Sequence, residues 1–119
     1  MTRLLAIALA GAAGAAARYG LGVAVGLRAF PWVTLAINVV GSFALGYVLG
    51  GPGARWNATV LAAVTVGFLG AFTTFSTFAW ETTELIRTGR QSTAVLYVIG
   101  SVAAGLLASA AGYLTGRST

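Results

Sequence analysis

The stretch of sequence that decides the fold is Ala58–Ile86, ATVLAAVTVGFLGAFTTFSTFAWETTELI. It is apolar for about 29 residues, and one straight helix of that length would be roughly 43 Å long. The hydrocarbon core of a bilayer is only about 30 Å thick. The middle of the stretch, Gly67–Phe78, holds two glycines and four hydroxyl residues, which suit a straight helix poorly. We therefore expect a membrane-spanning helix broken near residues 70–75, with the freed backbone groups buried in protein or facing a wet cavity.

Three further apolar stretches flank this one. Together the four predict membrane spans at residues 4–25, 33–50, 58–87 and 93–115. Short connections rich in glycine, proline and arginine separate them. The N-terminal run could imitate a signal peptide, but more spans follow, so it is interpreted as the first membrane helix. We expect residues 1–119 to form a single all-α integral membrane domain of the cell (inner) membrane.

Composition supports this class and excludes others. The chain is 58% hydrophobic and 8% charged, whereas soluble domains carry about 25% charged residues. It has no cysteine and no histidine, which excludes disulfides, cysteine nucleophiles and the usual zinc and haem ligands. No nucleophile–base pair or metal cluster is present, so the chain is not expected to be an enzyme. The seven arginines are scattered singly, which argues against a nucleic-acid partner.

The arginines do not favour one orientation in the membrane. With four spans, both termini lie on one side, and the arginines outside the spans divide three against three: Arg3, Arg55 and Arg117 against Arg28, Arg87 and Arg90. The positive-inside rule orients a membrane protein by an excess of arginine and lysine in the loops on one side, and here neither side has an excess. The count predicts insertion in both orientations, unless one arginine decides and the tie is accidental.

Polar residues inside the spans are candidate functional residues. Arg18 either snorkels to the interface or has a vestibule or structural role. Asn38 is either a hydrogen-bonding contact between helices or a ligand. Tyr97 is either an aromatic-belt residue or a pore hydroxyl, and Ser101 can return its hydroxyl to its own backbone.

An aromatic pair lies among hydroxyl residues in the third span. Phe75 and Phe78 are three residues apart and so share a helix face. Such a pair usually serves packing. Here Ser76 and Thr77 stand between them, and hydroxyl donors beside electropositive ring edges could serve an anion. Glu81 follows within a turn of Phe78 and is expected near the membrane surface.

These residues match a family. The whole chain resembles the small fluoride channels of the CrcB/Fluc family. Three segments carry the resemblance: Arg18-Tyr19 after Gly14-Ala15, the run Thr34–Phe43 (TLAINVVGSF), and Gly67–Phe78 (GFLGAFTTFSTF) followed by Glu81. The third segment is the most specific.

The resemblance implies a dual-topology antiparallel dimer with two fluoride pathways. The second copy would be identical or a close paralogue. A structural sodium ion would be held by the backbone carbonyls of Gly70 and Thr73. The fluoride pathway implied by the family comprises Asn38, Phe75, Phe78, Ser76, Thr77, Tyr97 and Ser101, with Arg18 and Glu81 in vestibule or structural roles. Gly105, one turn after Ser101, departs from relatives whose hydroxyl track continues there, and Ala71 replaces a common glycine.

The expected function is passive, fluoride-selective export from the cytoplasm, which reduces fluoride toxicity. Neutral donors can replace the water of a strongly hydrated anion without binding it too tightly to conduct.

Two other functions stay open. A small dual-topology multidrug exporter would need an embedded carboxylate, and the first two spans contain none. A non-conducting membrane assembly subunit would not need the run of hydroxyl and aromatic residues.

Overall fold

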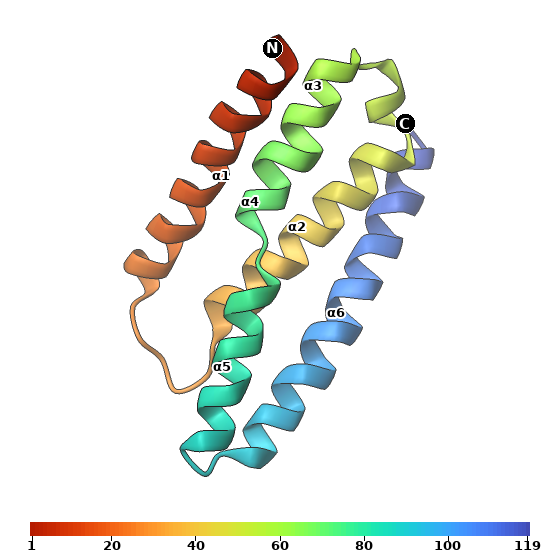
Figure 1. The fold of residues 1–119 in the computed structure, drawn as a ribbon. Coiled ribbons are helices and arrows are strands. Elements are labelled where there is room, and N and C mark those ends of the chain that lie inside the picture. Colours follow the sequence, from red (N-terminus) through yellow and green to blue (C-terminus); the bar gives the residue numbers. More distant parts are fainter.

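The chain folds into four long helical rods, the third of which is broken. A computed structural model describes residues 1–119 (Figure 1). The first, second and fourth rods are α1 (Thr2–Val25), α2 (Trp32–Gly50) and α6 (Gln91–Arg117). The third rod comprises α3 (Ala58–Ala62), the π-helical segment η2 (Ala63–Leu69), α4 (Gly70–Phe72) and α5 (Phe75–Arg87). A short 3₁₀ helix, η1 (Pro52–Arg55), connects α2 to the third rod.

Each rod is long and apolar enough to cross a membrane. The four have 24, 19, 30 and 27 residues. Only 15 of the 119 residues are buried within the chain, and large apolar side chains cover much of its surface. Such a surface suits lipid and not water. The expectation of an all-helical membrane protein with four spans and a broken third helix is confirmed.

The break moves the third rod from one neighbour to another. Above it, η2 and α4 pack along α1, and below it α5 packs against α6 (Figure 1). The first and third rods run in one direction, while α2 and α6 run side by side in the other. Both termini therefore lie at the same end of the molecule. A straight third helix could not pack against both partners.

Glycines allow the helices to approach closely. A methyl group added at Gly46 or Gly112 would collide with the backbone of the facing helix, because α2 and α6 touch there without intervening side chains. Gly14 of α1 meets the Phe68 carbonyl in the same way. Small residues at helix contacts are the usual means of packing helices in lipid, where no hydrophobic force drives them together.

Candidate functional site

The break in the third rod lies at two threonines. Thr73 (φ −78°, ψ 158°) and Thr74 (φ −152°, ψ 117°) are both extended. Gly70, which the sequence had suggested as part of the non-helical stretch, is helical at φ −63° and ψ −34°. That expectation is wrong for Gly70 and right for Thr73. The side chain of Thr74 explains where the second half begins, because its hydroxyl accepts the Thr77 N–H at 3.2 Å and so caps α5.

Asn38 closes the break from α2. Its amide Nδ2 donates to the Thr74 carbonyl at 3.0 Å, and its Oδ1 accepts the Thr74 N–H at 2.8 Å. Both backbone groups of this extended residue are thus satisfied by one side chain. An amide carries two N–H donors, so the second remains for another acceptor. Asn38 also lines a cavity of about 280 Å³, and Gly70, Thr73 and Phe75 line the same cavity.

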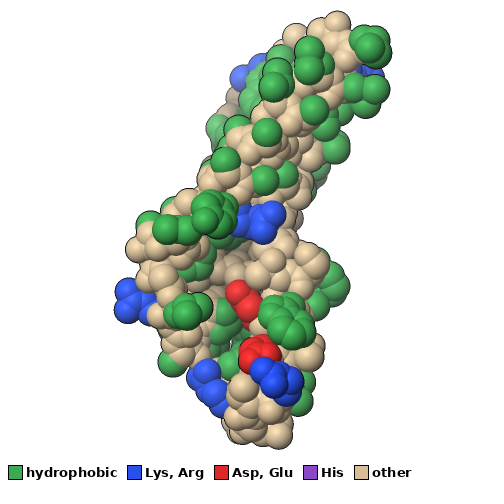
Figure 2. Space-filling model, turned by 60° about the vertical axis from the view of Figure 1, so that its left-hand side comes forward, with side chains coloured by type: hydrophobic (Ala, Val, Ile, Leu, Met, Phe, Trp, Pro, Cys, Tyr) green, Lys and Arg blue, Asp and Glu red, His purple; other side chains and the backbone are tan.

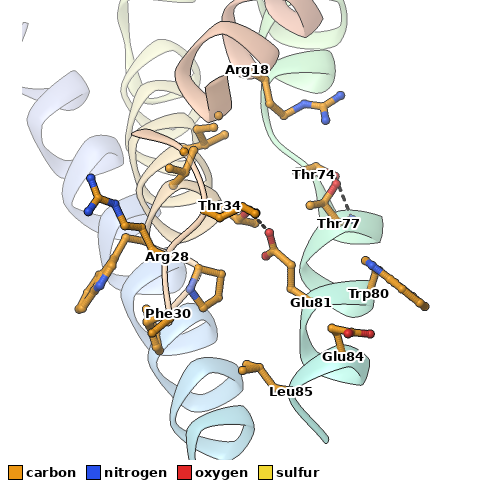
Figure 3. A pocket seen from close by; sticks show the side chains of 18 of the residues that line it. Arg18, Arg28, Phe30, Thr34, Thr74, Thr77, Trp80, Glu81, Glu84 and Leu85 are labelled. Carbon is orange, nitrogen blue, oxygen red and sulfur yellow. Dashed lines mark hydrogen bonds between the residues drawn. The ribbon is translucent and has the colours of Figure 1, made fainter. Parts of the chain in front are cut away.

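Arg18 reaches the break from α1. Its Nε donates to the Ala71 carbonyl at 3.1 Å. In an unbroken helix that carbonyl would accept the N–H of Phe75, four residues on. The guanidinium therefore replaces a hydrogen bond that the break removes. Arg18 is partly buried and directed toward the break (Figure 3), not toward the end of α1.

The carbonyls of Gly70 and Thr73 are among those that lose their helical donors at the break. In an α-helix, Gly70 would accept the N–H of Thr74 and Thr73 would accept the N–H of Thr77. Here those N–H groups donate to the side chains of Asn38 and Thr74 instead. Gly70 and Thr73 both border the 280 Å³ cavity. Two residues whose carbonyls lack helical donors thus lie beside one cavity.

Glu81 accepts two hydroxyl groups inside the helix bundle. Thr34 donates to one of its carboxylate oxygens at 2.8 Å and Tyr97 to the other at 2.6 Å. Tyr97 is fully buried, so it is not an aromatic-belt residue. Glu81 on α5 thus contacts α2 through Thr34 and α6 through Tyr97, and its expected position near the membrane surface stays a prediction. These contacts join three helices through one carboxylate.

The phenylalanine pair continues into a row of aromatic rings. The rings of Phe75 and Phe78 are 5.7 Å apart, and those of Phe78 and Tyr97 are 5.1 Å apart. Phe75 is 78% exposed in the single chain. Gly70 is also exposed and borders the same 280 Å³ cavity as Phe75, so the two lie on one open side. An aromatic ring and two free carbonyls are therefore available to whatever covers this side.

The remaining predicted residues extend the polar surface. The hydroxyl of Thr77 accepts a hydrogen bond from Thr74 at 3.1 Å, and that of Ser76 lies 3.5 Å from the same Thr74 oxygen. The hydroxyl of Ser101 on α6 is buried and has no hydrogen-bond partner. It does not return to its own backbone, as a lone helical serine can. Ser101 therefore keeps an unused donor in the interior.

A cavity of about 780 Å³ opens beside this site. Arg18, Thr34, Thr74, Thr77 and Glu81 all line it (Figure 3). Figure 2 shows both acidic side chains of the chain on the lower half of one face, beside basic side chains.

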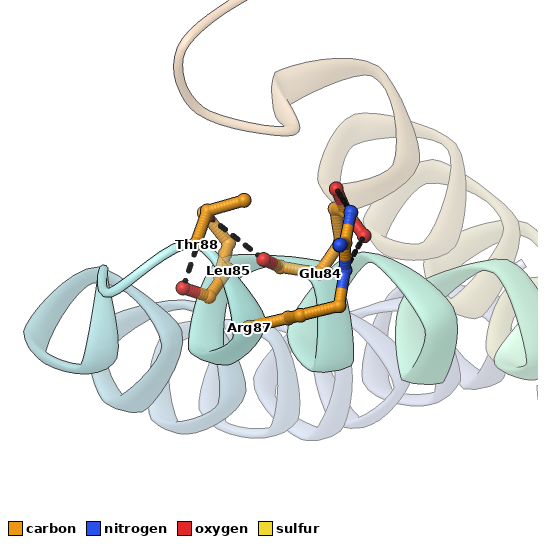
Figure 4. Close-up of polar contacts among 4 residues, drawn as sticks. All are labelled: Glu84, Leu85, Arg87 and Thr88. Carbon is orange, nitrogen blue, oxygen red and sulfur yellow. Dashed lines mark hydrogen bonds and ion pairs between the residues drawn. The ribbon is translucent and has the colours of Figure 1, made fainter.

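Glu84 lies at the outer end of this cavity and is held locally. It forms an ion pair with Arg87 at 2.7 Å, one turn along α5 (Figure 4). The Thr88 hydroxyl donates to the Glu84 carbonyl at 2.8 Å. These contacts close the end of α5, where its last carbonyls lack helical donors. They belong to the helix end and do not reach the break.

Comparison of the sequence with known proteins identifies a family. The model of the family described as CrcB-like protein, Camphor Resistance (CrcB), matches residues 5–113. The chain belongs to the CrcB family. It is 46% identical to the fluoride-specific ion channel FluC of Geobacter sulfurreducens, with 98% of each chain covered. It is 44% identical to that of Thermus thermophilus (98% and 96% covered) and 46% identical to FluC 2 of Geobacillus kaustophilus (92% and 88%).

The structure of this CrcB protein brings most of the predicted residues to the break. Arg18 and Asn38 contact the break directly, while Glu81 joins Tyr97 below it. Ser101 makes no contact with them through hydrogen bonds. Sequence reasoning missed Thr34 and Thr74. Thr34 stands four residues before Asn38 and hence on the same face of α2, which was the available signal. Nothing local distinguished Thr74 from its neighbours.

Proposed function

We infer that this CrcB protein is the subunit of a fluoride-specific ion channel that lets fluoride leave the cell, and that it is not an enzyme. The observation that carries the inference is 46% identity to a fluoride-specific ion channel over 98% of both chains. The geometry supports a passive pathway. Neutral donors line the region of the break, and a small anion needs donors to replace its water.

We propose that fluoride passes along Asn38, Phe75, Phe78, Ser76, Thr77, Tyr97 and Ser101. The free N–H of Asn38 and the unpartnered hydroxyl of Ser101 support this track. The electropositive edges of the Phe75 and Phe78 rings would contribute without a formal charge. A fixed charge in the narrow part would hold the anion too strongly for it to leave. Arg18 and Glu81 are engaged with protein groups beside the track.

We further propose that a structural sodium ion binds the carbonyl oxygens of Gly70 and Thr73. Their lost helical donors support this, because bare carbonyls are costly in a membrane interior. Oxygen ligands suit a hard cation. An antiparallel second copy, related by a two-fold axis, would supply a second pair of oxygens. The balanced arginines and the exposed side that carries Gly70 and Phe75 support such a dimer.

The function can be tested with the purified chain alone. Proteoliposomes loaded with fluoride should release it without an imposed proton or sodium gradient, and should release chloride far more slowly. The measurement is halide efflux recorded with ion-selective electrodes. Equal efflux of both anions would overturn the proposal. Transport only with an imposed gradient would indicate a transporter, and no transport would favour a non-conducting subunit or a requirement for a paralogue.

Replacing either phenylalanine should reduce fluoride flux. We expect Phe75→Ile and Phe78→Ile each to lower efflux by about tenfold or more while the protein stays assembled, since an apolar swap of similar size usually costs less than about 1.5 kcal/mol. What is lost is the ring edge that faces the anion. Phe43→Ile is the matched control, because Phe43 stacks on Tyr47 and is not part of the proposed pathway. Normal flux in both variants would assign the rings to packing.

A further inference from the structure

We propose that Arg18 is a positioning residue that caps the broken helix and thereby sets the cation affinity of the break. This inference rests on the proposed sodium site. The capping contact itself is the hydrogen bond from Arg18 Nε to the Ala71 carbonyl at 3.1 Å. A positive group at a helix C-terminus satisfies a free carbonyl and interacts favourably with the helix dipole. Here the cap comes from another helix, 53 residues away in the chain.

The packing of α1 brings Arg18 to this carbonyl. A methyl group at Gly14 would collide with the Phe68 carbonyl, so the two backbones touch at that level. The third rod runs parallel to α1 here. Arg18 is one turn after Gly14, and Ala71 is nearly one turn after Phe68. The close contact therefore places the Arg18 guanidinium beside the last helical turn before the break.

Capping Ala71 determines where the neighbouring carbonyls point. Gly70 is still helical, whereas Thr73 is extended, so the direction of the Thr73 carbonyl depends on how the last helical turn is held. The Ala71 oxygen is held toward α1, while Gly70 and Thr73 both border the 280 Å³ cavity. Asn38 fixes the next residue, Thr74, from the opposite helix. Arg18 and Asn38 together hold both ends of the turn that presents the two oxygens.

The experiment compares Arg18→Lys and Arg18→Ala with Arg28→Ala. Lysine keeps the charge but has no donor at the Nε position. Arg28 lines the same large cavity and makes no hydrogen bond within the chain, so its loss removes an equal charge without uncapping the helix. Fluoride efflux is measured against sodium concentration, with a large organic cation replacing sodium. Hydrogen exchange of the backbone amides at residues 70–78 is measured in parallel.

We expect both Arg18 variants to raise the sodium concentration for half-maximal flux by about tenfold, as for the loss of one charge-assisted hydrogen bond. Amide exchange at the break should accelerate in both, and Arg28→Ala should change neither measurement by more than about twofold. An unchanged half-maximal concentration, or an equal shift in Arg28→Ala, would overturn the proposal. So would normal exchange at the break. If the wild-type flux ignores sodium, the sodium site fails, and accelerated exchange would still identify Arg18 as the cap.

Discussion

Gly112→Ala should destabilise the folded protein by about 3 kcal/mol, the upper end of the usual cost of overpacking. The added methyl group would collide with the Phe43 carbonyl and lie 2.9 Å from the Tyr47 nitrogen. Both obstacles are backbone atoms of α2, so no side chain can turn aside to make room. The two helices would have to separate along their whole contact, which continues at Gly46 and Gly116. Thermal unfolding in detergent, followed by tryptophan fluorescence, measures the effect.

The matched control is Gly100→Ala in the same helix. A methyl group there meets nothing within 4 Å. Alanine is favoured over glycine in a helix by roughly 1 kcal/mol, so this variant should be as stable as the parent or slightly more stable. Equal melting temperatures for the two variants would show that the contact between α2 and α6 is looser than the structure indicates.

The four-helix architecture could be predicted because it depends on local properties. The length of each apolar stretch, set against the thickness of a bilayer, is enough to count the spans. The excess length of Ala58–Arg87 also predicted a break. The position of the break was less accessible, because the glycines suggested bending at Gly70. A methyl group added at Gly67 would lie only 2.7 Å from the carbonyl oxygen of Ile7. The small size of Gly67 therefore allows close contact with α1 and does not serve flexibility.

The site depends on contacts between distant parts of the chain. Asn38 and Thr74 are 36 residues apart, and Thr34 and Glu81 are 47 apart. Spacing within one helix predicts which residues share a face, but not which face meets which. Family resemblance supplied the list of residues. The structure adds what each contacts: Arg18 caps α4, Asn38 satisfies Thr74, and Glu81 accepts two hydroxyls.

Asn38→Leu should abolish fluoride flux, lowering it by about a hundredfold or more. Leucine has the same branched shape and is somewhat larger, so it still fills the position in α2. Both backbone groups of Thr74 lose their partners at once, and each buried group left bare costs about 1–3 kcal/mol. The break would then rearrange to satisfy them. Efflux from proteoliposomes measures the flux, and melting in detergent measures the accompanying loss of stability.

Asn57→Ala is the control, because Asn57 also makes two side-chain hydrogen bonds, to the N–H groups of Thr59 and Val60. It lies at the exposed start of α3, where water can replace the lost bonds, so the cost should be about 1 kcal/mol with flux retained.

Asn38→Asp separates folding from conduction. Its carboxylate can still accept the Thr74 N–H, yet its second oxygen faces the Thr74 carbonyl and its charge repels an anion. We expect this variant to assemble without conducting. Normal flux in Asn38→Leu would contradict the role of Asn38 at the break, and normal flux in Asn38→Asp would remove Asn38 from the fluoride pathway.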